Sequence, residues 1–588
     1  LNGDESLSKL LVQQGAEVDL VDSHGETPVS LAISKNHGDL ATLLLKNSKF
    51  KYSLKNGDSL LHRAASVGND KLISQLLQAG LNPVQKNQDG YFPVHLAISN
   101  GFLASAKQLM SVYPVPATGT EATSAENTDF TDSRIVYWSS LYWAGMRTEL
   151  LNHLEQDLLS QNPHVLAPYV WVSMHDAHDQ LESALITAKT KIRAQVQRLA
   201  EIKQLDDAGK YQELFKRFPP ELDYSASEIF GLSDLAYAAK YVAKFELSYR
   251  YWQKAILLKP DSWQALWGFQ SEELLNAPVI REQAKSIAMH PKLVGTLASV
   301  ILKEASNARE WGAPSSLKWT QTWLEHFPND VRALTDRAFD LRNIKQFEEA
   351  LRLSQKADLL FPFYGNRDLT PEILVRLGKT ERAKRLTEVV AARFDYDQSP
   401  FPTKSVGATY YGEALRKAGD LGEARRVLET AVKKWPNVAR LQKELGLLER
   451  RDKRYSQAAE YFEKLVALKS KPSNSDYVSL IDIYVKNKQY SKVISLTQQL
   501  LAKPRFYSQA IYLDMLEGAV KLENESLVEK IMSHARAHAG VDADLQVALY
   551  EYWWQQGKHQ DVLTGLSQLA NLRPGYSKAL KAWLNKLE

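Results

Sequence analysis

The sequence predicts an all-α fold made of two successive series of helical repeats. A segment with a turn glycine recurs three times within the first 113 residues, and a 34-residue pattern of small and apolar residues recurs through the rest. Self-similarity at a fixed period of this length is typical of stacked helical units. With 588 residues, the chain is also too long for a single hydrophobic core.

The first series aligns on Gly25, Gly57 and Gly90, which are 32 and 33 residues apart. The three copies read GETPVSLA, GDSLLHRAA and GYFPVHLA. Glycine suits a turn with positive φ, and the proline of two copies suits the first turn of a helix. These segments resemble the ankyrin repeat, whose hallmark is G-x-T-P-L-H-x-A. The resemblance covers about residues 3–113 and implies roughly three stacked repeats.

Two histidines, His62 and His95, occupy the histidine position of this motif. They could be metal ligands, but we favour hydrogen bonding within each repeat. The chain opens at Leu1, inside what should be the second helix of a repeat. We interpret this as a fragment, or as an array that begins with an atypical cap.

Residues 114–133 are rich in Thr, Ala, Ser and Pro, which predicts a flexible linker. The segment 176–206 has no Gly or Pro and places apolar residues on one helical face, which predicts a long amphipathic helix. We favour packing of this helix on its own array, and pairing with another chain is the alternative. The expected divisions are 1–113 (first repeats), 114–133 (linker), 134–228 (a hairpin and the long connecting helix), 229–397 (further repeats), 398–406 (a break or hinge) and 407–588 (further repeats).

The second series is clearest in a unit that starts near Ser405 and ends at Pro436. Its small and apolar positions recur 34 residues later, or 35 for the last one, and the two sets are Gly412, Ala424, Leu428 and Ala431, then Gly446, Ala458, Phe462 and Val466. This pattern resembles the tetratricopeptide repeat (TPR), a helix–turn–helix unit. The resemblance implies about ten units between residues 134 and 588, stacked as an α–α superhelix, or α-solenoid.

The composition argues against several classes of function. The net charge of +4 argues against general nucleic-acid binding, and no apolar run is long enough for a membrane-spanning helix. The chain has no cysteine, which excludes thiol catalysis, disulfides and cysteine-based metal sites. We therefore expect a soluble chain, with the bacterial periplasm or export favoured and the cytoplasm as the alternative.

The best catalytic candidate is MHDAHD at residues 174–179, where His175, His178 and Asp179 share one helical face. No third metal ligand lies at a characteristic spacing from them. We therefore favour a solvent-exposed helix N-terminus, with Asp and His near its cap. The sequence contains no glycine-rich phosphate loop and no G-x-S-x-G motif. We therefore predict no catalytic residue, no metal site and no cofactor, and we do not expect an enzyme.

The TPR resemblance implies a groove lined by the first helix of each hairpin. Counting its groove-facing positions selects a basic and aromatic set: Tyr237, Lys240, Tyr241, Arg332, Arg342, Arg416, Lys417, Arg440, Lys443, Arg450, Arg451, Tyr477 and Tyr484. Such a face suits an acidic or C-terminal peptide, although some members could be ordinary solvated helix charges. Thr409 and Glu413 stand where the carboxylate clamp of chaperone-binding relatives has Lys and Asn, so chaperone binding is not implied.

The leading hypothesis is a non-enzymatic scaffold that binds proteins or peptides through two repeat surfaces, with avidity gained by linking them. One alternative is an exported bacterial effector acting on host proteins. Another is an accessory repeat region of a larger bacterial enzyme, and a third is a metal-dependent hydrolase at His175 and His178. The oligomeric state stays open, and so does the question whether the ankyrin part docks on the solenoid or moves independently of it.

Overall fold

The computed structural model describes residues 4–23, 25–48, 54, 57–116, 133–159, 190–242, 244–273, 286–308, 317–360, 369–392, 403–469, 472–502, 509–538, 550–551, 553–555, 557 and 559–572. All regular secondary structure in these residues is helical, which confirms the all-α prediction. The chain forms two compact units, Leu1–Val172 with Phe327–Ala431, and Ser173–His326 with Val432–Glu588. Each unit joins stretches that are distant in sequence, whereas the expected divisions follow chain order.

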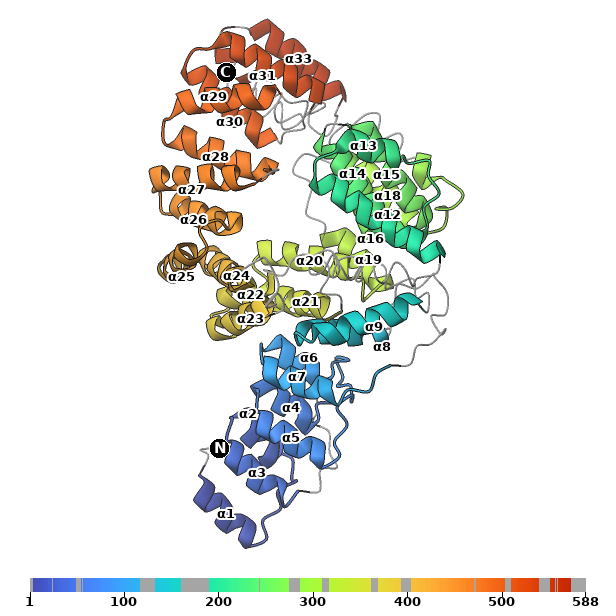
Figure 1. Ribbon diagram of the computed structural model, residues 1–588, viewed down its shortest axis with the longest axis vertical. Helices are drawn as coiled ribbons and strands as arrows, with labels where there is room; N and C mark the ends of the chain where they lie inside the picture. Colours follow the sequence, from blue (N-terminus) through green and yellow to red (C-terminus); the bar gives the residue numbers. More distant parts are fainter. Residues whose placement is uncertain are drawn as a thin grey trace. The chain divides into compact units, whose positions relative to one another are not determined.

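Unit 1 contains two groups of helices (Figure 1). The first group is α1 (Glu5–Gln13), α2 (Pro28–Ser34), α3 (Gly38–Leu45), α4 (Leu60–Val67), α5 (Asp70–Gln78), α6 (Pro93–Ser99) and α7 (Leu103–Ser111). The second group is α8 (Ser133–Trp143), α9 (Arg147–Leu159), α20 (Val331–Asn343), α21 (Phe347–Leu360), α22 (Leu369–Arg376), α23 (Thr380–Ala392), α24 (Thr403–Ala418) and α25 (Leu421–Lys434), whose last turn belongs to unit 2.

The first group stacks as helical hairpins. Each of α2, α4 and α6 packs on the helix that follows it and on the first helix of the next hairpin. The turn before each first helix is built in the same way in all three copies. Backbone N–H groups of Asp22, Leu54 and Asn87 donate to the carbonyl four residues later, at 2.8, 3.0 and 2.9 Å. The glycines of these turns have φ of 78°, 75° and 80°, as a left-handed turn position requires.

The last hairpin of this group docks on α23. Arg382 and Arg385 donate from Nε to the carbonyl oxygens of Ser99 and Asn100, at 2.9 and 3.0 Å. The Arg385 guanidinium also lies 4.8 Å from the centre of the Phe102 ring. Carbonyls at a helix C-terminus lack intrahelical partners, and here the two arginines supply them. The small hairpins and the longer helices of unit 1 therefore pack directly on one another.

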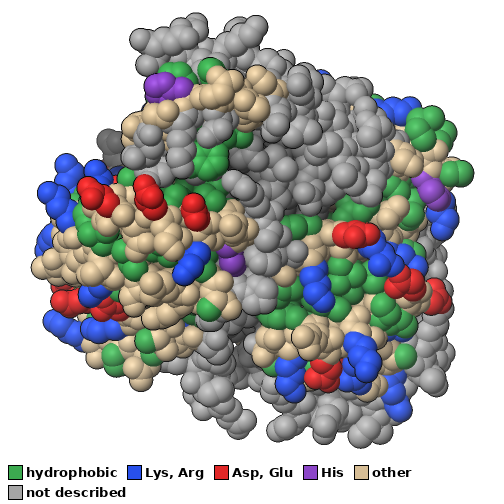
Figure 2. Space-filling view, turned by 90° about the horizontal axis from the view of Figure 1, so that it is seen from above, with side chains coloured by type: hydrophobic (Ala, Val, Ile, Leu, Met, Phe, Trp, Pro, Cys, Tyr) green, Lys and Arg blue, Asp and Glu red, His purple; other side chains and the backbone are tan. Residues whose placement is uncertain are grey.

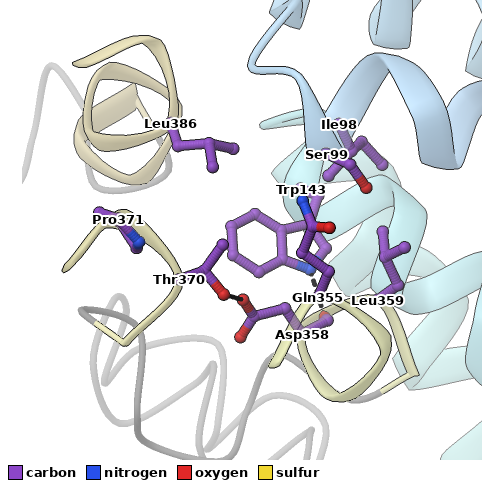
Figure 3. Close-up of a pocket in the computed structure, with 9 residues that line it drawn as sticks. All are labelled: Ile98, Ser99, Trp143, Gln355, Asp358, Leu359, Thr370, Pro371 and Leu386. Atoms are coloured by element: carbon purple, nitrogen blue, oxygen red, sulfur yellow. Dashed lines mark hydrogen bonds between the residues drawn. The ribbon is translucent and has the colours of Figure 1, made fainter. Parts of the chain in front are cut away.

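A second set of bonds joins α8 to α21 beside this contact (Figure 3). The Trp143 indole Nε1 donates to the Asp358 carbonyl at 2.6 Å, and the Ser139 hydroxyl donates to the Leu360 carbonyl at 3.0 Å. Thr370 donates to the Asp358 carboxylate at 2.7 Å. The recess between these side chains has about 20 Å³ of space open to water, enough for roughly one water molecule. The junction is a packing contact between the two groups of helices.

Unit 2 also contains two groups of helices (Figure 1). The first is α12 (Thr190–Asp207), α13 (Tyr211–Arg217), the 3₁₀ turn η2 (Ala226–Glu228), α14 (Ile229–Tyr241), α15 (Phe245–Leu258), α16 (Trp263–Glu273), α18 (Leu297–Ala308) and α19 (Leu317–His326). The second is α26 (Ala439–Arg451), α27 (Tyr455–Leu468), α28 (Asn474–Lys486), α29 (Tyr490–Leu501), α30 (Gln509–Lys521), α31 (Glu525–His538) and α33 (His559–Leu572).

The predicted long helix appears in part as α12. Its apolar residues Val196 and Leu199 are buried, and the helix packs on α13 and α14 of its own unit. Residues 176–189 of that prediction lie outside the described residues. So do most of the expected linker and the first residues of the expected break.

The turns between paired helices reveal the true period of the last repeats. Lys453, Lys488 and Glu523 each adopt positive φ, at 59°, 55° and 49°, at the same place in three successive hairpins. They are 35 residues apart, although Gly419 and Lys453 are separated by the predicted 34. Beyond Lys453, counting in steps of 34 therefore falls one residue short per hairpin.

Substituting Gly101 tests the docking of α6 and α7 on α23. Gly101 has φ of 76°, and a Cβ there would lie 2.6 Å from Arg385 Cβ and 2.8 Å from the Arg385 carbonyl carbon. Gly80 has φ of 83° with nothing within 4 Å, so Gly80→Ala carries the backbone strain alone. We expect Gly101→Ala to lower the free energy of unfolding by about 1 to 3 kcal/mol more than Gly80→Ala in urea denaturation. Equal losses would show that α23 does not pack there.

Candidate partner-binding surfaces

The first helices of the hairpins present exposed faces that carry most of the sequence-predicted residues. We call each of these a first-helix face. In unit 1 it is formed by α20, α22 and α24, and in unit 2 by α26, α28 and α30.

The unit 1 face is organised around Glu372, whose side chain is only 2% exposed. Its carboxylate pairs with Arg342 at 2.7 Å, with Lys417 at 3.2 Å and with Arg376 at 3.4 Å. Lys417 also pairs with Glu413 at 2.8 Å. Three cations thus meet two carboxylates, which leaves this cluster with one net positive charge.

An aromatic side chain borders the Glu372 cluster. Phe339 is 43% exposed, and the guanidinium of Arg342 lies 4.1 Å from the centre of its ring. Arg332, about two turns before Phe339 on α20, pairs with Asp336 at 3.3 Å. Arg416 is half-buried on α24, next to Lys417. The structure therefore brings Arg342 and Lys417 to one carboxylate and places Arg332 in a separate pair.

The unit 2 face carries a row of basic side chains along α26. Arg440 and Arg451 are exposed, and Lys443 and Arg450 are half-buried. Lys443 lies 3.9 Å from the Asp476 carboxylate, and Arg450 pairs with Asp482 at 3.1 Å. Leu447 lies in the same row and packs partly on the core. This row is the densest group of sequence-predicted residues on any one helix.

The two predicted tyrosines of α28 lie in the core of unit 2 and not on its surface. Tyr477 and Tyr484 are 5% and 7% exposed, and the Tyr484 hydroxyl donates to Glu463 at 2.8 Å. Steps of 34 from Lys443 and Arg450 reach these tyrosines, whereas the structurally equivalent residues come one position later. Those residues, Val478 and Val485, also pack on this core, so α28 has no basic side chain at either position.

The same extra residue hides two charged side chains of the unit 2 face from the sequence pattern. Counted in steps of 35, Leu447 corresponds to Asp482, and Arg451 corresponds to Lys486. Asp482 and Lys486 form an ion pair at 2.7 Å on the unit 2 face. The positive-φ turn position marks the 35-residue period. It is occupied by Lys and Glu, which are not typical of such turns, so the sequence does not indicate it.

The predicted residues of α14 lie on the other helical group of unit 2. Tyr237 is 46% exposed and meets the Trp252 ring edge-on, with centres 5.2 Å apart. The Tyr241 hydroxyl donates to the Pro472 carbonyl at 3.4 Å. Lys240 is half-buried. Tyr241 therefore links two segments of unit 2, while Tyr237 offers an exposed ring.

Acidic side chains stand among these basic ones. Figure 2 shows Lys and Arg interspersed with Asp and Glu on the side it displays. The buried carboxylates include Glu413, which lies on α24 with the buried Thr409. Binding at such faces would depend on local excess of charge, not on a uniformly basic surface.

The motif histidines have structural roles. In His62, Nδ1 accepts from the Ser59 backbone N–H at 3.0 Å, so its proton sits on Nε2, which donates to the Tyr91 carbonyl at 2.9 Å. In His95, Nδ1 accepts from the Phe92 N–H at 3.2 Å. Burial, with further contributions from His62 and Lys86, lowers the pKa of His95 to about 3. A neutral imidazole is therefore built into this stack.

The described residues show neither a cluster of metal ligands nor a membrane-spanning helix. Within the described ranges, no three His, Asp or Glu side chains gather as metal ligands would. The candidate pair His175 and His178 lies outside those ranges. Among the helices in the described residues, none combines the length and apolar character needed to cross a bilayer.

One further concave feature lies in the first helical group. A groove of about 250 Å³ separates α1 from α2 and α3, lined by apolar side chains such as Leu11, Val12 and Leu31. On α1 itself, Leu7 and Leu10 are each 53% exposed. This is an apolar surface at one end of the stacked hairpins.

Comparison with known sequences identifies the first series of repeats. Over 109 residues, 18% of the chain, the sequence is 33% identical to an ankyrin repeat protein of Fowlpox virus (strain NVSL), of which it covers 76%. The chain belongs to the ankyrin-repeat family. This ankyrin chain is also 32% identical to inversin of Canis lupus familiaris over 180 residues, 30% of its own length and 16% of inversin.

The second series is confirmed by a family model. The tetratricopeptide repeat model matches residues 412–475. The ankyrin chain thus continues as a TPR-type α-solenoid, a fold that generally mediates protein interactions. The pentatricopeptide repeat protein PPR10 from maize is similar over 99% of this chain and 90% of its own. Their identity of 12% and TM-score of 0.32 are too low to support any functional argument.

Removing the charge of Glu372 should destabilise unit 1. Glu372→Gln leaves Arg342, Arg376 and Lys417 without their shared buried carboxylate, so we expect the free energy of unfolding to fall by about 3 to 5 kcal/mol in urea denaturation. Glu423→Gln is the matched control, because Glu423 pairs with the exposed Arg426 on the surface. We expect little or no loss there. A small effect at both sites would contradict the organising role of Glu372.

Proposed function

We propose that this ankyrin and TPR protein is a non-enzymatic scaffold whose unit 2 first-helix face binds an acidic peptide segment of a partner. The observation that carries the proposal is the row of Arg440, Lys443, Arg450 and Arg451 along one face of α26. Guanidinium groups recognise carboxylates with two parallel hydrogen bonds, which gives Arg-rich faces geometric as well as electrostatic selectivity.

The shape of the row suits an extended segment better than a single ion. Residues 440, 443, 447 and 450 are spaced at three and four positions, so they follow one stripe of the helix. Arg440 and Arg451 stand at opposite ends of α26 and are exposed. Partly buried Leu447 gives the middle of the stripe an apolar contact. An acidic peptide with a central apolar residue would match this order.

The ankyrin repeats contribute a second surface with a fixed position in unit 1. Because Arg382 and Arg385 hold the Ser99 and Asn100 carbonyls, a partner bound to these repeats would be held in a set orientation relative to α20–α24. This supports a scaffold in which a partner on the ankyrin repeats has a set orientation within unit 1.

Charge reversal at the two ends of the row tests the proposal. A rhodamine-labelled polyglutamate peptide is titrated with the full chain, and binding is followed by fluorescence anisotropy at low and high salt. We expect Arg440→Glu with Arg451→Glu to weaken binding by at least about tenfold, since each reversal replaces attraction by repulsion. Wild-type binding should also weaken in high salt.

The control makes the same charge change on second helices. Lys464 of α27 and Lys530 of α31 are both exposed, and their reversal to Glu alters the net charge of the chain equally. We expect that double variant to bind nearly as wild type does. If both double variants weaken binding equally, the loss is explained by the net charge of the chain, and the proposed site on α26 is refuted.

A further inference from the structure

Two arginines of α23 carry the contact between the ankyrin hairpins and the longer helices of unit 1. Arg382 and Arg385 lie three positions apart, so they share one face of α23. Each donates from Nε to one of two successive carbonyls, those of Ser99 and Asn100, at 2.9 and 3.0 Å. The two guanidinium groups are therefore held side by side at the C-terminal end of α6.

The carbonyl bonds use only the Nε atom of each guanidinium. In the part of the chain that the structure describes, neither group forms a further hydrogen bond or an ion pair, and Arg385 adds only its contact with the Phe102 ring. Both side chains are half-buried, and among the described side chains neither arginine has a buried nitrogen without a partner. Solvent therefore reaches the Nη atoms, and they can donate to a ligand.

The protein groups around the pair do not balance its charge. A helix C-terminus carries only about half a negative charge, against two full positive charges here. Burial lowers the pKa of the Arg382 guanidinium, the charge of Arg385 lowers it further, and Glu348 of α21 opposes them. Glu348 already pairs with Lys379 at 3.4 Å. An anion between the two guanidinium groups would relieve their repulsion.

We propose that the Nη groups of Arg382 and Arg385 bind a phosphate group at the junction between the ankyrin hairpins and α23. Guanidinium groups bind phosphate oxygens with two parallel hydrogen bonds. The carbonyl bonds hold both groups before a ligand arrives, which lowers the entropic cost of binding. A phosphate carries up to two negative charges at neutral pH and can neutralise the pair, whereas a carboxylate would leave one positive charge. This site lies in unit 1 and is independent of the peptide site proposed on α26.

Phosphate binding would also strengthen the docking of α6 and α7 on α23. A bound phosphate removes the repulsion between two guanidinium groups that both contact the end of α6. A ligand that binds only the docked form shifts the equilibrium toward that form. The coupling is reciprocal, so a change that loosens the docking weakens phosphate binding.

Arginine-to-lysine substitutions separate the shape of the guanidinium groups from their charge. The full chain is titrated with inorganic phosphate by isothermal titration calorimetry, with the ionic strength kept constant by sodium chloride. We expect wild type to bind in the millimolar range or more tightly, and Arg382→Lys with Arg385→Lys to bind at least about fivefold more weakly. An ammonium group that takes the carbonyl cannot also present two parallel donors to phosphate.

Two controls exclude binding elsewhere on the chain. Arg425→Lys with Arg426→Lys makes the same change on α25, where the guanidinium groups pair with Glu429 and Glu423. Arg440→Glu with Arg451→Glu removes the basic row of α26. We expect both double variants to bind phosphate as wild type does.

A further variant leaves both arginines in place and acts on the docking alone. Gly101→Ala puts a Cβ 2.6 Å from Arg385 Cβ, whereas Gly80→Ala meets nothing within 4 Å. We expect Gly101→Ala to weaken phosphate binding by about threefold or more, and Gly80→Ala to leave it unchanged. Equal binding by these two variants would overturn the coupling between phosphate and docking, even if the lysine variant did not fold.

A short alanine peptide with one phosphoserine, and its unphosphorylated twin, distinguish the sources of the phosphate group. If inorganic phosphate binds and the phosphopeptide does not, the site takes a small phosphate compound. If the phosphopeptide binds and its twin does not, the site takes a phosphorylated protein segment. The proposal is overturned if neither ligand binds wild type, if the two lysine variants bind equally, or if only the α26 charge reversal abolishes binding.

Discussion

Each helical hairpin of this protein has an apolar face that only a neighbouring hairpin can cover. The rest of the structure depends on this constraint, because no hairpin has a core of its own. It explains why small residues recur where helices cross. Gly412 faces Leu428, and Gly446 faces Phe462, at distances where a Cβ would lie 2.5 and 3.0 Å from the larger side chain. Close approach there fixes how one helix sits on the next.

The elements of the fold could be predicted from the sequence because the residues that stacking requires recur at the repeat period. The turn glycines of the ankyrin repeats and the small residues of the 412–475 region are examples. It did not predict the docking of α6 on α23, because the acceptors at Ser99 and Asn100 are backbone carbonyls. A backbone acceptor leaves no trace in a sequence.

The surface was harder to predict than the fold, for a related reason. A groove position is defined by its distance from the hairpin turn, so one added residue shifts the count by one position. Steps of 34 therefore select the buried Tyr477 and Tyr484, one position before the residues equivalent to Lys443 and Arg450. The basic residues of α26 precede the added residue, and they keep their expected face. Repeat spacing also cannot predict which charged side chains pair. The three cations that share Glu372 are an example.

The junction between α6 and α23 also constrains future sequence change unequally. Every amino acid supplies a carbonyl, so positions 99 and 100 could vary widely and still accept the same hydrogen bonds. Positions 382 and 385 have less freedom, because their side chains must carry a donor to those oxygens. Divergent copies of this protein could therefore change residues 99 and 100 more readily than residues 382 and 385.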